Sequence, residues 1–275
     1  MRLGTIRRDG DTVAVVVEGD SATVLSASDV AAVLAHGLGE LDSLRTTQTL
    51  PLSAVDFAPL VPNPGATWCV GLNYAGHAEE TGAPLPDFPT VFSKMASALI
   101  GAHDDIRFPL ATVSDQMDWE AELVVVIGSS IRYADAAQAE AAIAGYTVGN
   151  DISVRDWQLR TTQWLLGKTL ESSSPVGPWL VTKDEFGPLE GKSITCEVDG
   201  KIVQESDTGD LHFKPATLIS YISQMTTLNP GDLIFTGTPS GVALSREGQP
   251  WLTPGAVVRT HIDGIGDLVN TCVRA

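Results

Sequence analysis

Hydrophobic and polar residues along the chain are arranged mainly in the short blocks that are typical of strands. Blocks of aliphatic and β-branched residues, bounded by glycine, proline or acidic turn residues, predict strands. They lie at residues 12–17, 68–71, 90–94, 123–127 and 146–151, and in the segment 230–242 before its glycine-rich end. Asp-Gly turns at residues 199–200 and 263–264 predict two further hairpins, at residues 193–204 and 257–273.

Helical spacing of apolar residues is confined to a few short stretches. A short helix is expected before Gly37, with Val30, Val33 and Leu34 on one face and Ser28 or Asp29 as its cap. The alanine-rich stretch 135–144 predicts a second helix, which Gly145 would stop. A third helix is predicted to begin at residue 214. Its expected buried face carries Leu218, Ile219, Ile222 and Met225.

A shift in composition divides the chain near residue 62. Four prolines and a glycine occur between residues 51 and 65, a density that interrupts regular structure. Residues 1–62 are therefore expected to form a small N-terminal domain that contributes little chemistry, and residues 63–275 to form the main domain. A chain of 275 residues is long enough to bury a large core in this arrangement.

The formal net charge of -17 argues against a nucleic-acid or anionic-membrane partner, because the basic residues are scattered. A small anionic substrate would need a locally positive site. Cys69, Cys196 and Cys272 lie far apart in apolar surroundings, which predicts buried free thiols and a reducing compartment. No apolar run has the length of a signal core or a membrane span, so the expected location is cytoplasmic.

Two glutamates at the start of the strand at residues 123–127 are candidate metal ligands. If the strand extends back to Glu120, then Glu120 and Glu122 project to the same side of the sheet. Buried carboxylates repel each other, and a divalent cation such as Mg2+ or Mn2+ would compensate both charges. The alternative is a solvated strand end with two surface acids. Asp118 is interpreted as a turn residue or a partner of the ligands.

Asp151 is a third candidate ligand, because it also ends an apolar strand. Carboxylates from two neighbouring strand ends would form a facial set of three oxygen ligands and leave positions for water or a chelating substrate. The alternative role of Asp151 is to cap the segment that follows it. Arg155 and Gln158 lie shortly beyond.

His77 and Glu80 are spaced one helical turn apart, at i and i+3. A carboxylate at this spacing can orient an imidazole and raise its basicity, as a general base requires. The alternative is a surface ion pair of small energetic value. Residues 81–89 are rich in glycine and proline, so the pair is expected at the mouth of a loop that could close over a site.

Two lysines and one loop complete the candidates. Lys168 begins a polar loop and could neutralise a carboxylate or a developing enolate, although an exposed lysine is the commoner case. The role of Lys94, at the end of a strand, stays open between structural pairing and a place in the site. The segment 236–241 offers backbone N–H groups and hydroxyls, but it lacks the lysine of a phosphate-binding loop, which argues against a nucleotide.

Six motifs occur in one order: GLNYAGH, FSK, DWEAELVVVIG, GYTVGNDISVRDWQ, GKTLESSSPVGP and GDLIFTGTPSGV. In this order the chain resembles the fumarylacetoacetate hydrolase family over residues 66–275. The resemblance implies a β-rich α+β fold, namely a mixed β-roll or distorted β-barrel with a small N-terminal α+β domain. It also implies a homodimer.

The resemblance assigns roles to nine residues. It implies that Mg2+ or Mn2+, with Ca2+ as a substitute in a crystal, is bound by Glu120, Glu122 and Asp151, and that no organic cofactor is used. The implied acid/base pair is His77 and Glu80. The implied contacts to the substrate carboxylate and oxyanion come from Arg155, Gln158 and Lys168, and the implied loop over the ligand carries Thr238.

The activity expected from this resemblance is hydrolysis of a C–C bond in a small 2,4-dioxo acid, an acylpyruvate, through an enolate. Decarboxylation, dehydration and keto–enol isomerisation of a 2-oxo acid pass through the same enolate and stay open. A non-catalytic protein that binds a metal and a small molecule is a further alternative. Residues 172–174 and 243–251 depart from the family pattern, so the tail of the substrate stays open.

Overall fold

The computed structural model describes residues 1–80, 82 and 84–274. Its largest sheet has eleven strands, and ten of them follow one hydrogen-bonded path. In spatial order the path runs β4 (Arg45–Pro51), β3 (Ser21–Leu25), β2 (Asp11–Glu18), β1 (Arg2–Arg8), β13 (Ser174–Thr182), β11 (Ile143–Asn150), β10 (Ala121–Ile127), β16 (Leu233–Phe235), β5 (Thr67–Gly71) and β6 (Thr90–Ser93). The eleventh strand, β7 (Leu99–Ile100), pairs with β13.

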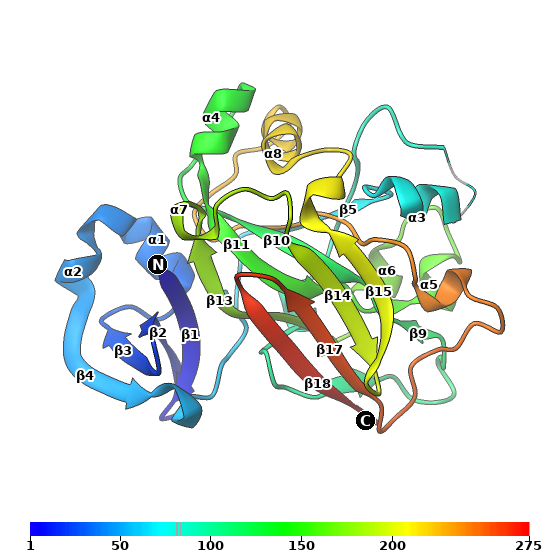
Figure 1. Ribbon diagram of the computed structural model, residues 1–275, viewed down its shortest axis with the longest axis horizontal. Coiled ribbons are helices and arrows are strands. Elements are labelled where there is room, and N and C mark those ends of the chain that lie inside the picture. The colour runs from blue at the N-terminus through cyan, green and yellow to red at the C-terminus, as the bar shows by residue number, and fades with distance from the viewer. Residues whose placement is uncertain (81, 83, 275) are drawn as a thin grey trace.

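A second sheet of five strands lies across the middle of the first one (Figure 1). Its order is β15 (Lys201–Asp207), β14 (Ser193–Val198), β17 (Val257–Ile262), β18 (Gly266–Arg274) and β8 (Ile106–Phe108). A separate pair is formed by β9 (Met117–Asp118) and β12 (Ser153–Val154). Neither large sheet closes on itself, so the β-rich α+β class is confirmed as an arrangement of open sheets.

The helices are short and lie at the edges and ends of the sheets (Figure 1). They are α1 (Val30–His36), α2 (Leu41–Leu44), α3 (Ala75–Glu80), α4 (Ala136–Ala141), α5 (Arg155–Gln158), α6 (Leu165–Lys168), α7 (Lys183–Phe186) and α8 (Pro215–Ser223). Single 3-10 turns occur at Leu38–Glu40, Leu52–Ala54, Ala96–Ala98, Thr208–Asp210 and Ala243–Ser245. None of the helices in the described part of the chain has the length and apolar character needed to cross a membrane.

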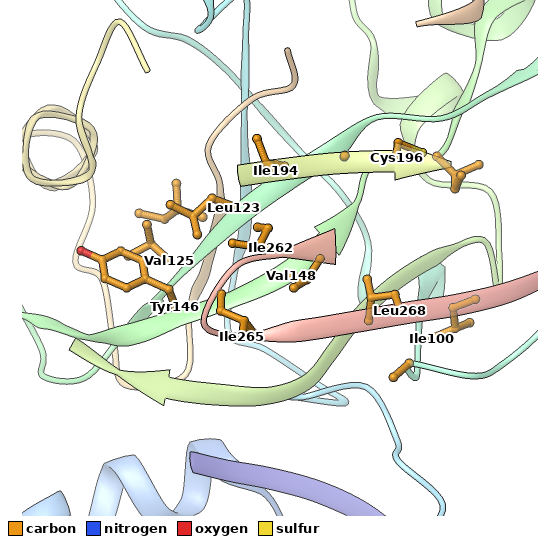
Figure 2. Close-up of a cluster of buried hydrophobic side chains, with 14 of the residues drawn as sticks. Ile100, Leu123, Val125, Tyr146, Val148, Ile194, Cys196, Ile262, Ile265 and Leu268 are labelled. Carbon is orange, nitrogen blue, oxygen red and sulfur yellow. The ribbon is translucent and has the colours of Figure 1, made fainter. Parts of the chain in front are cut away.

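Strand β10 organises the core because it is buried on both faces. Leu123 and Val125 point to the space between the two large sheets, where they join residues of β11, β14, β17 and β18 (Figure 2). Val124 and Val126 belong to a second cluster on the opposite face, together with residues of β1 and α1. Alternation along one strand therefore serves two cores, and the strand is fixed firmly enough to position charged side chains at its first residues.

The N-terminal strands extend the large sheet. In β1, residues Arg2, Leu3 and Gly4 pair with Val181, Leu180 and Trp179 of β13. Backbone hydrogen bonds between β1 and β13 therefore join the two sides of the predicted division near residue 62, which rests on a change in composition. The assignment of residues 1–62 to a separate domain stays a prediction.

Several local predictions are confirmed. Asp29 caps α1 by accepting a hydrogen bond from Ala32 N, at 2.8 Å. The hairpin at Asp199 and Gly200 joins β14 and β15, and all three cysteines are buried free thiols. The strand that carries the glutamates begins at Ala121, so it contains Glu122 and starts one residue after Glu120.

Two helix predictions were partly wrong. The alanine-rich helix α4 ends at Ala141, and β11 already begins at Ile143, before the glycine that was expected to stop the helix. Gly145 instead lies in a strand contact, where an added Cβ would meet Val181 O at 2.0 Å. Helix α8 ends at Ser223, so Met225 is 79% exposed and does not join the core.

We expect Gly145→Ala to lower the free energy of unfolding by about 2 kcal/mol or more, because neither backbone at this strand contact has room to move. Gly39→Ala is the matched control, since nothing lies within 4 Å of its added Cβ. Urea denaturation of both variants measures the difference. Equal midpoints for the two variants would show that β11 and β13 can separate without loss of stability.

Candidate active site

Glu120, Glu122 and Asp151, called the acid triad below, come together at the ends of two neighbouring strands. The register of β10 and β11 pairs Ala121 with Asn150, and Asp151 N donates a hydrogen bond of 2.8 Å to Glu120 O. Each residue offers a carboxylate oxygen, and these atoms lie within 4.8 Å of one another. All three side chains are buried, so the interpretation as exposed surface acids is wrong.

The acid triad has the chemistry of a site for a hard divalent cation. Glu122 Oε2 accepts a hydrogen bond of 2.7 Å from Gly237 N. Asp151 Oδ1 lies 2.8 Å from Lys94 Nζ and is buried. Three buried carboxylates whose oxygens lie within 4.8 Å of one another match the ligand preference of Mg2+ and Mn2+.

Two buried lysines, Lys94 and Lys168, compensate part of the negative charge. Lys168 Nζ lies 2.6 Å from Glu120 Oε2 and 3.0 Å from Asp151 Oδ2. Lys94 Nζ, besides its contact with Asp151, donates to the carbonyl oxygens of Ile152 and Lys168. Both are nearly inaccessible, so the interpretation of Lys168 as a surface lysine is wrong, and Lys94 is a partner of the acid triad.

Arg155 links the acid triad to α5. Its Nη1 lies 2.7 Å from Glu120 Oε1 and donates to Gln158 Oε1 at 2.8 Å. The single turn of α5 places Arg155 and Gln158 on one side, three residues apart. Arg155 Nη2 is buried and donates to no acceptor within the described residues.

Asp118 was not predicted as a site residue, but it holds Arg155 in place. Its carboxylate accepts from Arg155 Nε at 2.8 Å and from the backbone N–H groups of Trp119, Ala243 and Leu244. The signal in the sequence is that Asp118 alternates with the two glutamates along the chain. This spacing alone does not indicate a chemical role.

Burial and neighbouring charges act in opposite directions on the two glutamates. Burial raises the pKa of Glu120, but the charges of Lys168 and Arg155 outweigh this effect and lower it to about 2. Burial raises the pKa of Glu122 well above its ordinary value, and repulsion from Asp151 and Glu120 adds to the rise. Without a cation, burial and the neighbouring carboxylates therefore favour the protonated form of Glu122.

His77 and Glu80 occupy α3 as predicted, with His77 Nδ1 3.4 Å from Glu80 Oε2. Both oxygens of Glu80 also lie 3.1 Å from Gly241 N, so this carboxylate connects α3 to the glycine-rich loop. The proposed lid at residues 81–89 is described in part, because Thr81 and Ala83 lie outside the described residues. Within the described part, the ring of Phe88 stacks on Tyr221.

Thr238 lies in the loop expected to cover the ligand, but its hydroxyl is occupied. Thr238 Oγ1 donates to Ala121 O at 2.9 Å and accepts from Gln204 Nε2 at 2.8 Å. The hydroxyl thus fixes the loop to the start of β10, beside the acid triad.

A cavity of about 230 Å3 brings most of these residues together. Its polar lining consists of His77, Glu120, Arg155, Gln158, Lys168 and Thr238. Three predicted site residues do not line the cavity but contact residues that do. Glu80 pairs with His77, Glu122 lies beside Glu120, and Asp151 pairs with Lys168. The rest of the lining was not predicted: it is Gly71 and the side chains of Val70, Leu72, Phe92, Trp164 and Leu244. No local pattern marks these five residues, because they come from four separate segments.

The chain is similar in sequence and in fold to known proteins. The family model described as fumarylacetoacetate (FAA) hydrolase C-terminal matches residues 66–273. Oxaloacetate tautomerase FAHD2A, mitochondrial, from Bos taurus is 44% identical over 226 residues, which cover 82% of this chain and 71% of the relative.

Two solved structures are similar over the whole chain. The 5-carboxymethyl-2-hydroxymuconate delta-isomerase from Mycobacterium smegmatis has a TM-score of 0.83 at 33% identity, covering 100% of this chain and 99% of that one. The fumarylacetoacetate hydrolase from Exiguobacterium antarcticum has a TM-score of 0.87 at 29% identity, covering 100% of both chains.

We expect Mn2+ to bind at the acid triad with an affinity that increases with pH. A ligand must be deprotonated, and the pKa of Glu122 is raised, so below that pKa the affinity should rise by about tenfold per pH unit. Glu122→Gln should weaken binding by about tenfold or more and flatten the pH dependence. Calorimetric titration of Mn2+ at several pH values measures both effects.

Glu140→Gln is the control for this titration, because it removes a carboxylate that pairs with Lys183 at the protein surface. It should bind Mn2+ like the unaltered protein. If Glu122→Gln also retained the full affinity and the same pH dependence, the cation would bind elsewhere.

Proposed function

Because the chain belongs to the fumarylacetoacetate hydrolase family, we propose that it is a divalent-metal-dependent enzyme that interconverts the keto and enol forms of a small 2-oxo acid. The observation that carries this proposal is the cavity in which His77, Arg155 and Lys168 meet beside the acid triad. Two of the relatives are named as a tautomerase and an isomerase, and keto–enol conversion needs no more than a base and a stabilised enolate.

The acid triad is proposed to hold Mg2+ or Mn2+. When bound, this cation would supply Lewis-acid stabilisation of the negative charge that develops on the substrate oxygen atoms. Its positive charge would also favour the ionised form of Glu122 over the protonated one. No organic cofactor is part of the proposal.

Arg155 and Gln158 are proposed to bind the substrate carboxylate. Arg155 Nη2 has no acceptor within the described residues, and a carboxylate is the acceptor that suits a guanidinium best. Asp118 fixes the other edge of the guanidinium, so the free donor is held in one orientation. Thr238 is proposed to keep the glycine-rich loop over the bound ligand through its bond to Ala121 O.

His77 is proposed to carry the proton. Glu80 would accept a hydrogen bond from His77 Nδ1–H, which makes Nε2 the nitrogen that acts as the base. In the conversion of keto to enol form, the C–H bond beside the carbonyl breaks and its proton moves to Nε2. The electron pair passes to the carbonyl oxygen, which the ammonium of Lys168 stabilises until it is protonated. The reverse steps convert the enol to the keto form.

The second candidate is hydrolysis of a C–C bond in an acylpyruvate, in which His77 activates water instead of removing a carbon-bound proton. The specific support is the likeness to a fumarylacetoacetate hydrolase together with the position of His77 on the cavity. Mass analysis of the products from acylpyruvates separates the two reactions, because hydrolysis yields two smaller acids and tautomerisation yields no new mass. Decarboxylation, dehydration and a purely binding role have no further support.

We expect the protein with Mg2+ to accelerate the conversion of enol-oxaloacetate to its keto form, followed by ultraviolet absorbance. His77→Ala should lower kcat by a factor of about 100 to 10,000, the usual contribution of a general base. The affinity for Mn2+ should not change, since His77 is not a member of the acid triad.

His103→Ala is the control for this experiment, because His103 is exposed on a turn outside the cavity lining. Its rate should equal that of the unaltered protein. An undiminished rate for His77→Ala would remove the pair His77 and Glu80 from the mechanism.

We also propose that the chain forms a homodimer through an apolar surface around Val113, Trp157 and Leu166. These side chains line a cavity of about 240 Å3, and Leu166 is 62% exposed. Exposed apolar patches of this kind mark association surfaces.

The cytoplasmic location stays a prediction, and the bovine relative is named as mitochondrial.

We expect light scattering to give the mass of a dimer, and Leu166→Lys to give that of a monomer. Met225→Lys is the control, since Met225, just after the end of α8, is an even more exposed apolar side chain that is not part of this surface. A monomeric mass for the unaltered protein would contradict the proposal.

A further inference from the structure

One side of the cavity is apolar. We call the side chains of Val70, Leu72, Phe92, Trp164 and Leu244 the apolar wall. A chain of contacts leads to it from the charged side. Lys168 Nζ lies 5.3 Å from the ring centroid of Phe92, and that ring packs edge-on against Trp164 at 5.4 Å. The charged and apolar parts of the cavity lining are therefore in direct contact, through Lys168 and Phe92.

The place of Trp164 depends on a glycine. A Cβ added at Gly71 would meet Cζ3 of the indole at 2.6 Å and Cη2 at 3.0 Å. The six-membered ring of the indole thus lies directly against the backbone of Gly71, which any larger residue would prevent. The ring of Phe92 also packs against the indole. These two contacts restrict the movement of the indole.

Leu72 contributes to the apolar wall at a conformational cost. Its φ is 56°, in the left-handed region where glycine and asparagine are favoured and a leucine is strained. The next residue fixes this conformation, because the side chain of Asn73 bonds to Phe213 N, Phe213 O and Thr236 O. A strained leucine at a cavity lining indicates that its side chain is needed there.

The cations of the cavity lining are already paired. Among the described lining residues they are Arg155 and Lys168. Arg155 is paired with Asp118 and Glu120, and Lys168 with Glu120 and Asp151. In the proposed function, the first carboxylate of the substrate binds Arg155. A second carboxylate, at the far end, would lie against the apolar wall without a partner, which is costly.

We propose that the apolar wall selects the tail of the substrate, so that 2-oxo acids with an uncharged aromatic or hydrocarbon tail are preferred over those with a second carboxylate. The inference rests on the proposed function and adds the substrate class. Trp164 is its main specificity residue, because its indole is the largest apolar surface in the wall.

The test compares phenylpyruvate with oxaloacetate in the Mg2+-loaded protein, by tautomerisation rate and by calorimetric binding. The ratio of kcat/KM should favour phenylpyruvate by about tenfold or more, the discrimination typical of an apolar pocket. Trp164→Ala should lower this ratio about tenfold, mainly through the KM of phenylpyruvate. Trp164→Phe should restore most of it. Trp164→Arg, which adds a cation to the wall, should reverse the preference.

Two results would show that the apolar wall does not select the tail, while the proposed function stands. One is a preference of the unaltered protein for oxaloacetate. The other is that Trp164→Ala and Trp164→Arg change kcat/KM for both substrates by the same factor. If neither acid is turned over, the proposed function fails, and the binding data still decide: tighter binding of phenylpyruvate that Trp164→Arg reverses supports the inference, and equal affinities overturn it. Melting temperatures of the variants identify any that fail to fold.

Discussion

The burial of the acid triad is the constraint on which the rest of the site depends. Like charges in a low-dielectric interior are costly unless each has a partner, and here the partners are two lysines and an arginine. Lys94 and Lys168 reach the acid triad from one side, and Arg155 reaches Glu120 from another. Together with Asp118, which pairs with Arg155, the group has one carboxylate more than it has cations. Burial and that excess together raise the pKa of Glu122.

A cation bound at the acid triad would explain how an acidic protein attracts an anionic substrate. The chain has a formal net charge of -17, so an approaching carboxylate meets a repulsive field at long range. At the site, the carboxylates outnumber the cations by one, and a bound divalent cation would change the net charge of the group from negative to positive. The lysines are already committed to the acid triad, so the cation would determine whether the cavity is locally positive. Binding of metal and binding of substrate are in this way coupled through charge alone.

The parts of the site that the sequence predicted are those governed by local geometry. Glu120 and Glu122 alternate along one strand, and Asp151 ends its hairpin-paired neighbour, so their proximity follows from strand periodicity and register. The pairing of Arg155 with Asp118 joins residues 37 positions apart, and no local pattern announces it. Gly145 was misread for a related reason: its role depends on the approach of β13, which periodicity within β11 does not contain.

The apolar wall shows why likeness to a family gives the reaction type before it gives the substrate. The charged groups that stabilise an enolate must occupy nearly fixed positions, because the chemistry constrains their distances. The tail of the substrate meets no such constraint, and any set of side chains that fills the space without clash can bind it. Here that set combines a missing side chain at Gly71 with a strained backbone at Leu72. Both features cost stability or freedom, and a cavity shaped only by packing would have no reason to retain the strained leucine.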